Sequence, residues 1–150
     1  MKREEIKTLI PHREPMLLID EITIDDKNIA HASYYVTGEE FFLKGHFPGN
    51  PIVPGVILCE IMAQSCCLLI KDVLKGRTPF YAGIDKVRFK KQVRPKDLIE
   101  VTAKIINRRA LVFFVETCAI VKGELCAQGT LSFALIDNDK LTTSSIQNEK

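Results

Sequence analysis

The sequence has no tryptophan, only three histidines and nearly balanced charge, with 21 basic and 19 acidic residues. A net charge of +2 over 150 residues gives no broad basic surface for nucleic acid. The N-terminal segment 1–7 lacks an apolar stretch, which predicts no signal peptide. The longest apolar run, residues 56–70, contains Glu60 and Gln64 and is shorter than the roughly 20 residues that span a bilayer. We expect a cytoplasmic protein without a membrane span and without a nucleic-acid partner.

The sequence also lacks the cysteine spacing that is typical of metal and redox sites. No C-x-x-C motif occurs, so the spacing predicts neither a zinc site nor a redox motif. Buried, unpaired thiols in a reducing compartment are the expected state. The cysteines all lie in apolar segments, at Cys59, Cys66, Cys67, Cys118 and Cys126.

The residues that are present predict one domain built mainly from strands. Apolar residues make up 46% of the chain, which is enough for a single core at this length. Alternation of apolar and polar residues, clearest at 98–106, predicts antiparallel strands with one buried face. The expected elements are a short helix at 3–10, strands at 16–24 and 29–36, a long helix at 55–75, and strands at 80–90, 98–106, 111–121 and 124–136.

The long helix determines the predicted architecture. It is apolar on nearly all sides, so other structure must cover it. A sheet of about six antiparallel strands around this helix gives an α+β fold in residues 1–136. One sheet covers only part of the helix, so we expect a second copy of the chain to cover the rest in a homodimer. Residues 137–150 are polar and without periodicity, as in a flexible tail.

Residues 44–64 carry the groups that acid–base chemistry needs. His46 lies in a loop rich in glycine and proline, and histidine can accept a proton near neutral pH. Glu60 lies in the apolar helix, where burial is expected to raise its pKa so that it can donate a proton. Gln64 shares its helical face and is expected to orient the carboxyl group. Taken singly, a loop histidine or a helical glutamate is more often structural, so the inference depends on their combination.

The predicted start of the helix adds a third feature. After Pro54, the backbone N–H groups of Gly55 and Val56 have no partner within the helix. Such donors suit a carbonyl oxygen that gains negative charge, and glycine allows a substrate to approach closely. A base, an acid and an oxyanion donor around an apolar pocket favour proton abstraction beside a carbonyl with loss of a neighbouring hydroxyl. This is a dehydration, or the reverse hydration.

Three segments resemble one known family. Residues 45–64 read G-H-F-P-G-N-P-I-V-P-G-V-I-L-C-E-I-M-A-Q, residues 9–20 read L-I-P-H-R-E-P-M-L-L-I-D, and residues 80–93 read F-Y-A-G-I-D-K-V-R-F-K-K-Q-V. They are similar to the 3-hydroxyacyl-[acyl-carrier-protein] dehydratases of bacterial type II fatty acid synthesis. The match is to the branch with glutamate, not aspartate, at the place of Glu60. The similarity extends in the family's order from Leu9 to Phe133.

The resemblance implies a hot-dog fold, in which a curved sheet wraps one long helix, and a dimer whose two sheets join. His46 of one subunit would take the proton from C2 of a (3R)-3-hydroxyacyl thioester. Glu60 of the other subunit would protonate the departing C3 hydroxyl, which leaves a trans-2-enoyl thioester. The Gly55 N–H would bind the thioester carbonyl, and Val56, Gln64 and Phe47 complete the expected substrate-binding set.

The resemblance also implies no metal and no other cofactor. The substrate would arrive on the phosphopantetheine arm of acyl carrier protein, which is the expected partner. Both a homodimer and a hexamer of three dimers are compatible with the family. Two other functions stay open: a hot-dog thioesterase in which Glu60 activates water, and a non-catalytic acyl-binding subunit. The second is disfavoured because a binder has no need of a buried titratable pair.

A short basic segment is the candidate surface for the carrier protein. Between Asp85 and Lys96 six basic residues face one acidic residue, so the local charge is +5. A solvated strand face explains such a run as readily as a docking surface for an acidic partner does. Of the other histidines, His12 is expected to be a turn residue without a direct catalytic role, and His31 to be structural or exposed. The docking candidates are Lys86, Arg88, Lys90, Lys91 and Arg94.

Overall fold

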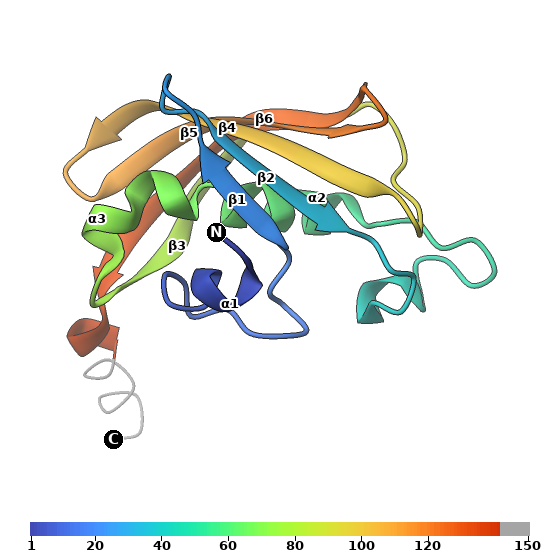
Figure 1. Cartoon of the computed structure of the whole chain (residues 1–150), viewed down its shortest axis with the longest axis horizontal. Coiled ribbons are helices and arrows are strands. Elements are labelled where there is room, and N and C mark those ends of the chain that lie inside the picture. The colour runs from blue at the N-terminus through green and yellow to red at the C-terminus, as the bar shows by residue number, and fades with distance from the viewer. Residues whose placement is uncertain (142–150) are drawn as a thin grey trace.

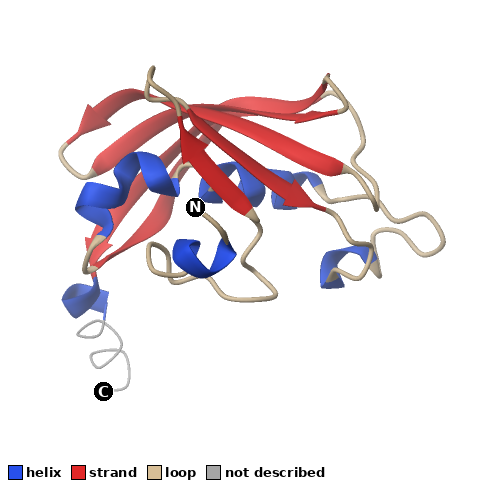
Figure 2. Cartoon of the chain, viewed as in Figure 1, coloured by secondary structure: helices blue, strands red, loops and turns tan. Residues whose placement is uncertain are grey.

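Six antiparallel strands form one curved sheet, and the helices lie against one face of it (Figures 1 and 2). This computed structural model describes residues 1–141. Along the sheet the strand order is β1-β2-β4-β5-β6-β3, and every neighbouring pair is antiparallel. The six strands expected from the sequence are therefore confirmed in the described part of the chain. They are β1 (Glu21–Ile24), β2 (Ala30–Tyr35), β3 (Arg77–Phe89), β4 (Leu98–Arg109), β5 (Val112–Val121) and β6 (Glu124–Asp137).

Alternation of apolar and polar residues orients the strands as predicted. In β4, Ile99, Val101 and Ala103 are buried, whereas Glu100 and Lys104 are exposed. Register shifts interrupt the pairing of β3 with β6, of β4 with β5 and of β5 with β6. Irregularities of this kind increase the local twist, which bends the sheet around the helices.

The long helix predicted for residues 55–75 is broken. At the break the Ser65 hydroxyl donates to the Ile61 carbonyl at 2.7 Å, and the Cys66 thiol donates to the Met62 carbonyl at 3.3 Å. Side chains that bond to carbonyls four residues earlier bend helices. The prediction of one continuous helix is therefore wrong, although its start at Gly55 is confirmed. The pieces are α2 (Gly55–Gln64), the 3-10 helix η2 (Cys67–Ile70) and α3 (Lys71–Leu74).

Residues 11–20 form an irregular segment, which we call the N-terminal strap. The prediction of a strand at 16–24 is wrong before Glu21, because the strap bonds to a helix side chain instead of entering the sheet. The Leu18 N–H donates to Gln64 Oε1, and Gln64 Nε2 donates to the Met16 carbonyl, each at 2.7 Å. The short helix α1 (Arg3–Ile6) precedes the strap. A second short helix, the 3-10 helix η1 (Phe41–Leu43), precedes the loop that contains His46.

One apolar core lies between the sheet and the helices. Ile61 and Met62 of α2 are fully buried, as are Val115 of β5 and Leu131 of β6. All five cysteines are free thiols and four of them are buried, as the sequence predicted. No helix within residues 1–141 has the length and apolar character needed to cross a membrane.

The C-terminal end of the described chain continues past the predicted domain boundary at residue 136. Asp137 is the last residue of β6 and pairs with Arg77 of β3, and residues 138–141 form a helical turn. The remainder of the predicted tail, residues 142–150, lies outside the described residues. Strand β3 is at one edge of the sheet and exposes Phe80, Ile84 and Phe89.

Candidate active site

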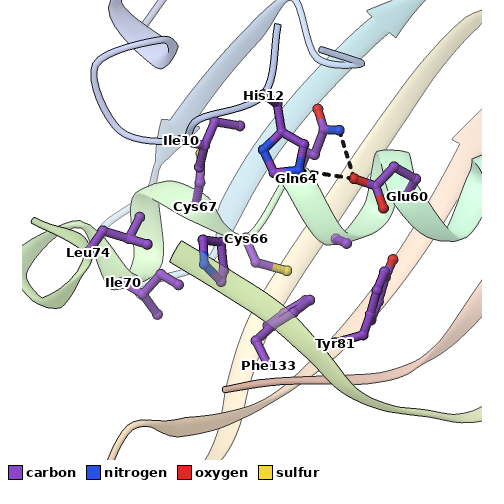
Figure 3. Close-up of a pocket in the computed structure, with 12 residues that line it drawn as sticks. Ile10, His12, Glu60, Gln64, Cys66, Cys67, Ile70, Leu74, Tyr81 and Phe133 are labelled. Carbon is purple, nitrogen blue, oxygen red and sulfur yellow. Dashed lines mark hydrogen bonds and ion pairs between the residues drawn. The ribbon is translucent and has the colours of Figure 1, made fainter. Parts of the chain in front are cut away.

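Glu60 lies on α2 and faces a small cavity between the helices, the N-terminal strap and β3 (Figure 3). Its Oε1 atom accepts a hydrogen bond of 2.9 Å from Gln64 Nε2 and lies 3.3 Å from His12 Nε2. The side chain is only 19% exposed. The hydrogen bond predicted between Gln64 and Glu60 is present. The contact with His12 was not predicted.

Gln64 is fixed by more than its bond to Glu60. Its amide oxygen accepts the Leu18 N–H and its amide nitrogen donates to the Met16 carbonyl, so both ends of the group bond to the strap. The residue is 4% exposed. With these bonds its amide positions Glu60 from within the protein, and a direct contact between Gln64 and substrate stays a prediction.

The cavity beside Glu60 encloses about 80 Å³. Its polar groups gather at one end, where the Tyr81 ring of β3 stands opposite Glu60 (Figure 3). The Tyr81 hydroxyl donates to the Cys59 carbonyl at 3.0 Å, which fixes the ring across the space. The cavity is therefore suited to an apolar chain with a reactive polar group at one end. Its apolar lining comes from Ile10, Ala63, Cys66, Cys67, Ile70, Leu74, Pro79 and Phe133.

The protonation of Glu60 is set by opposing effects. Burial acts to raise its pKa, as the sequence suggested. Hydrogen bonds from His12 and Gln64, with a further contribution from Tyr81, outweigh burial and lower the pKa below its ordinary value. The prediction of a raised pKa is therefore wrong for the single chain, because burial was the only effect that the sequence revealed. Burial and the nearby Glu60 charge raise the pKa of Tyr81.

His46 lies in the loop between η1 and α2, and its geometry suits a base. Its Nδ1 atom is 2.9 Å from the Ile52 carbonyl oxygen. A carbonyl can only accept, so Nδ1 carries the hydrogen and the lone pair of the neutral ring is on Nε2. The ring stacks on Phe47, with 4.0 Å between the ring centroids. Orientation by the backbone thus leaves Nε2 as the atom that can accept a proton.

His46 faces an open groove, which does not include Glu60. The groove is formed by the His46 loop, the first turn of α2 and the segment after β3, including Lys90 and Lys91. Three apolar side chains at this groove are widely exposed, Phe47 at 49%, Phe89 at 54% and Val56 at 76%. A single chain therefore places the two predicted catalytic residues in different pockets. Their meeting across a dimer stays a prediction.

The start of α2 supplies the expected donors. The Ile57 and Leu58 N–H groups donate to the Pro54 carbonyl, so those of Gly55 and Val56 precede the first helical bonds. A Cβ atom on residue 55 would lie 2.9 Å from Cζ of Phe89. A larger residue here would therefore require the exposed Phe89 ring to shift, a constraint that the sequence did not reveal.

The five basic docking candidates are all exposed, but they do not form one cluster. Lys90 and Lys91 line the groove of His46, and Lys91 also forms an ion pair with Glu124. Lys86 lies in a separate hollow over β4, β5 and β6. Arg94 bonds to Asn50 in the His46 loop at 2.7 Å. The groove thus has a basic border formed by Lys90, Lys91 and Arg94.

Sequence reasoning missed two residues of the Glu60 cavity, His12 and Tyr81. His12 stands between Pro11 and Arg13, where a turn was the simplest interpretation. A polar residue that is 25% exposed beside a carboxylate could not be inferred from that position. Tyr81 lies next to Phe80 in β3, where alternation indicates only that the two side chains point to opposite faces.

Comparisons with known proteins identify the family. The family model described as a FabA-like domain matches residues 10–130, which is most of the chain. The chain belongs to the FabA-like family. Within the family it is similar to proteins named 3-hydroxyacyl-[acyl-carrier-protein] dehydratase FabZ. The relative from Caldicellulosiruptor saccharolyticus is 44% identical over 133 residues, which cover 87% of this chain and 95% of the relative. The relative from Clostridium perfringens is 43% identical over 137 residues, which cover 90% and 99%.

Solved structures show that this FabA-like chain has the hot-dog fold. A dehydratase heterocomplex, ApeI:P from Xenorhabdus doucetiae, matches with a TM-score of 0.74 at 18% identity, over 92% of this chain and 95% of that one. The fluoroacetyl-CoA thioesterase FlK matches with a TM-score of 0.69 at 16% identity, over 85% and 98%. At these identities the likeness concerns the fold alone. The predicted hot-dog architecture and the predicted family are both confirmed.

Proposed function

We propose that the protein is a 3-hydroxyacyl-[acyl-carrier-protein] dehydratase of fatty acid elongation in the cytoplasm. The observation that carries this proposal is the oriented Glu60 carboxyl at the polar end of an apolar cavity, in a chain 43–44% identical to dehydratases over nearly their whole length. A dehydratase needs an acid where the C3 hydroxyl leaves and apolar space for the acyl chain. Glu60 and its cavity meet both needs.

The reaction uses one base and one acid. His46 Nε2 takes the proton from C2, and the electrons of that C–H bond form the C2–C3 double bond. The C3–O bond breaks, and the oxygen takes the proton of Glu60 and leaves as water. The Gly55 N–H stabilises the negative charge that grows on the thioester oxygen. The proton then returns from His46 to Glu60 through water, which restores both residues.

A shared site in a homodimer supports this chemistry. The Glu60 cavity and the His46 groove are separate in one chain, and β3 and the start of α2 expose apolar side chains that a second copy would cover. Substrate and partner would also exclude water from Glu60. Exclusion of water acts to raise the pKa of a carboxyl, and so supplies the protonated form that dehydration requires. Light scattering distinguishes the dimer from the hexamer of three dimers.

The basic border of the His46 groove is the proposed docking surface for acyl carrier protein. We expect Lys90→Glu to raise KM for carrier-bound substrate about tenfold and to leave KM for the small pantetheine thioester unchanged. Lys27→Glu, a matched change in the distant β1–β2 turn, should alter neither. Equal effects on both substrates would contradict docking through Lys90.

The function is tested with purified protein and short 3-hydroxyacyl or enoyl thioesters. We expect reversible interconversion followed by enoyl absorbance, unchanged after treatment with a metal chelator. His46→Ala and Glu60→Gln should each reduce kcat at least about a thousandfold. Release of free thiol without change in enoyl absorbance would identify a thioesterase instead. Tight binding of acyl carrier protein without turnover would identify an acyl-binding subunit.

A further inference from the structure

We propose that His12 is a positioning residue for Glu60, and that it does so by donating a hydrogen bond from Nε2 to Oε1. This inference deepens the proposed function and rests on it, because it assigns a role at the same site. His12 lies 48 residues before Glu60, on the N-terminal strap, and points into the cavity toward the carboxylate (Figure 3). Two nitrogen donors, from His12 and Gln64, thus converge on one carboxylate oxygen.

The surroundings of His12 determine which ring nitrogen carries the hydrogen. Within the described residues, Nδ1 of His12 is buried and has no hydrogen-bond partner. A hydrogen on Nδ1 would have no acceptor, and a lone pair on Nε2 would face the lone pairs of a carboxylate oxygen. The ring therefore carries its hydrogen on Nε2, which lies 3.3 Å from Glu60 Oε1. In this tautomer His12 is a donor toward Glu60 and has no second partner to satisfy.

The strap fixes His12 through its own backbone. The Arg13 guanidinium donates to the carbonyls of Ile10 and His12 at 3.0 and 2.6 Å, and to that of Lys7 at 3.1 Å. Beyond His12, Gln64 bonds to the Met16 and Leu18 backbone. The histidine is therefore anchored on both sides, as a residue that positions another group must be.

Because His12 and Gln64 both donate to Oε1, the two oxygens of the Glu60 carboxyl have different roles. Oε1 is the fixed oxygen, and Oε2 is the one that exchanges its proton with the substrate. The other titratable groups around Glu60 are Tyr81 on β3, Cys59 on α2 and Cys66 in the break after α2, and none of them belongs to the strap. Removal of the His12 donor therefore frees the carboxyl to rotate and destabilises its ionised form.

The test compares two amides of different reach. In His12→Gln the amide nitrogen can take the place of Nε2, whereas in His12→Asn the amide is too short to reach Glu60. We expect His12→Asn to lower kcat about ten- to a hundredfold, with KM within about twofold of wild type. Because Glu60 acts in its protonated form, we expect the alkaline limb of the kcat/KM profile to move to higher pH by about one unit. His12→Gln should restore most of kcat and the original limb.

His31→Asn is the matched control, because His31 lies on the exposed β1–β2 hairpin, where it pairs with Asp25. It should leave both kcat and the alkaline limb unchanged. Equal kcat and equal alkaline limbs in wild type, His12→Asn and His12→Gln would overturn the proposal. An equal loss of kcat in both His12 variants, without movement of the alkaline limb, would also overturn the proposal and indicate a structural role for His12.

A second measurement separates this inference from the proposed function. Carboxyl ¹³C NMR can follow the titration of Glu60 without turnover, with Glu60→Gln used to assign the signal. We expect the Glu60 midpoint to lie at higher pH in His12→Asn than in wild type, and to return in His12→Gln. If the wild-type protein dehydrates no substrate but this shift appears, the proposed function fails and the positioning contact stands. An identical midpoint in all three proteins would contradict the contact itself.

Discussion

The two halves of the candidate site differ in how far one chain completes them. Glu60 is 19% exposed, lies 3.3 Å from His12 of the strap, accepts a hydrogen bond from Gln64 of α2, and faces a cavity of about 80 Å³. His46 is oriented by a single backbone carbonyl and faces an open groove bordered by exposed apolar side chains. The predicted acid is thus positioned within its own chain, whereas the predicted base lies on an exposed surface. This asymmetry fits the proposed dimer, in which a second chain would cover the exposed apolar surface of the His46 half.

The largest expected effect comes from mixing two inactive variants. His46→Ala and Glu60→Gln chains, unfolded together and refolded, should form mixed dimers with one intact site. Because half of randomly paired dimers are mixed and each has one of two sites, activity should return to about a quarter of wild type. Measurement is by enoyl absorbance. Each variant refolded alone is the control, and absence of recovery despite mixed dimers would place both residues of a site in one chain.

A charged side chain on the exposed surface beside His46 should prevent the proposed dimer from forming. Val56 is 76% exposed in the second position of α2, where aspartate is favourable to the helix itself. Buried against a partner, the same charge would cost about 3–5 kcal/mol. We expect Val56→Asp to be a folded monomer by light scattering, with activity at least about tenfold lower. Tyr35→Asp on β2 is the control and should stay dimeric. A dimeric, fully active Val56→Asp would contradict the assignment of this surface.

A change at the closed half should alter substrate preference without altering assembly. Leu74 is 2% exposed and forms part of the apolar cavity wall. Leu74→Ala should destabilise the chain by about 2–5 kcal/mol and enlarge the cavity. We expect kcat/KM to shift several-fold toward longer acyl chains in a panel of 3-hydroxyacyl substrates. Leu131→Ala is equally buried but does not line the cavity, and it should lower stability without this shift.

The smallest expected effect is a dependence of stability on pH at the closed half. The pKa of Glu60 in the folded chain is lowered, so its ionised form stabilises the fold. This contribution is fully present above the unfolded-state pKa and is lost as pH falls through the lower folded-state value. The difference in unfolding free energy between wild type and Glu60→Gln should therefore shrink below about pH 4.5 in urea titrations. Glu4→Gln, at an exposed position, should show no such change.

Features that depend on local pattern were predictable from the sequence. The alternation in β4 gave its buried face, and Pro54 followed by Gly55 gave the start of α2. The spacing of Glu60 and Gln64 gave their hydrogen bond, because residues four apart share a helical face.

Features that depend on a distant or unusual partner were not predictable. The break after Gln64 arises from side-chain bonds of Ser65 and Cys66 that an apolar pattern does not contain. Residues 16–19 are apolar enough for a strand, but the Met16 carbonyl and the Leu18 N–H form hydrogen bonds with the Gln64 side chain instead. The pKa of Glu60 was predicted in the wrong direction because the contact with His12 crosses 48 residues of sequence.

The strand order has a consequence for the time at which the site forms during synthesis. Strand β3 pairs with β6, the last strand of the sheet, and the cavity wall draws Tyr81 from the first and Phe133 from the second. Because a chain emerges from the ribosome from its N-terminus, α2 and β3 appear long before their last partner. Until then the apolar side chains of β3 are covered neither by β6 nor by the proposed second subunit. The nascent protein therefore carries its predicted catalytic residues early, and its cavity closes only when the last strand has been made.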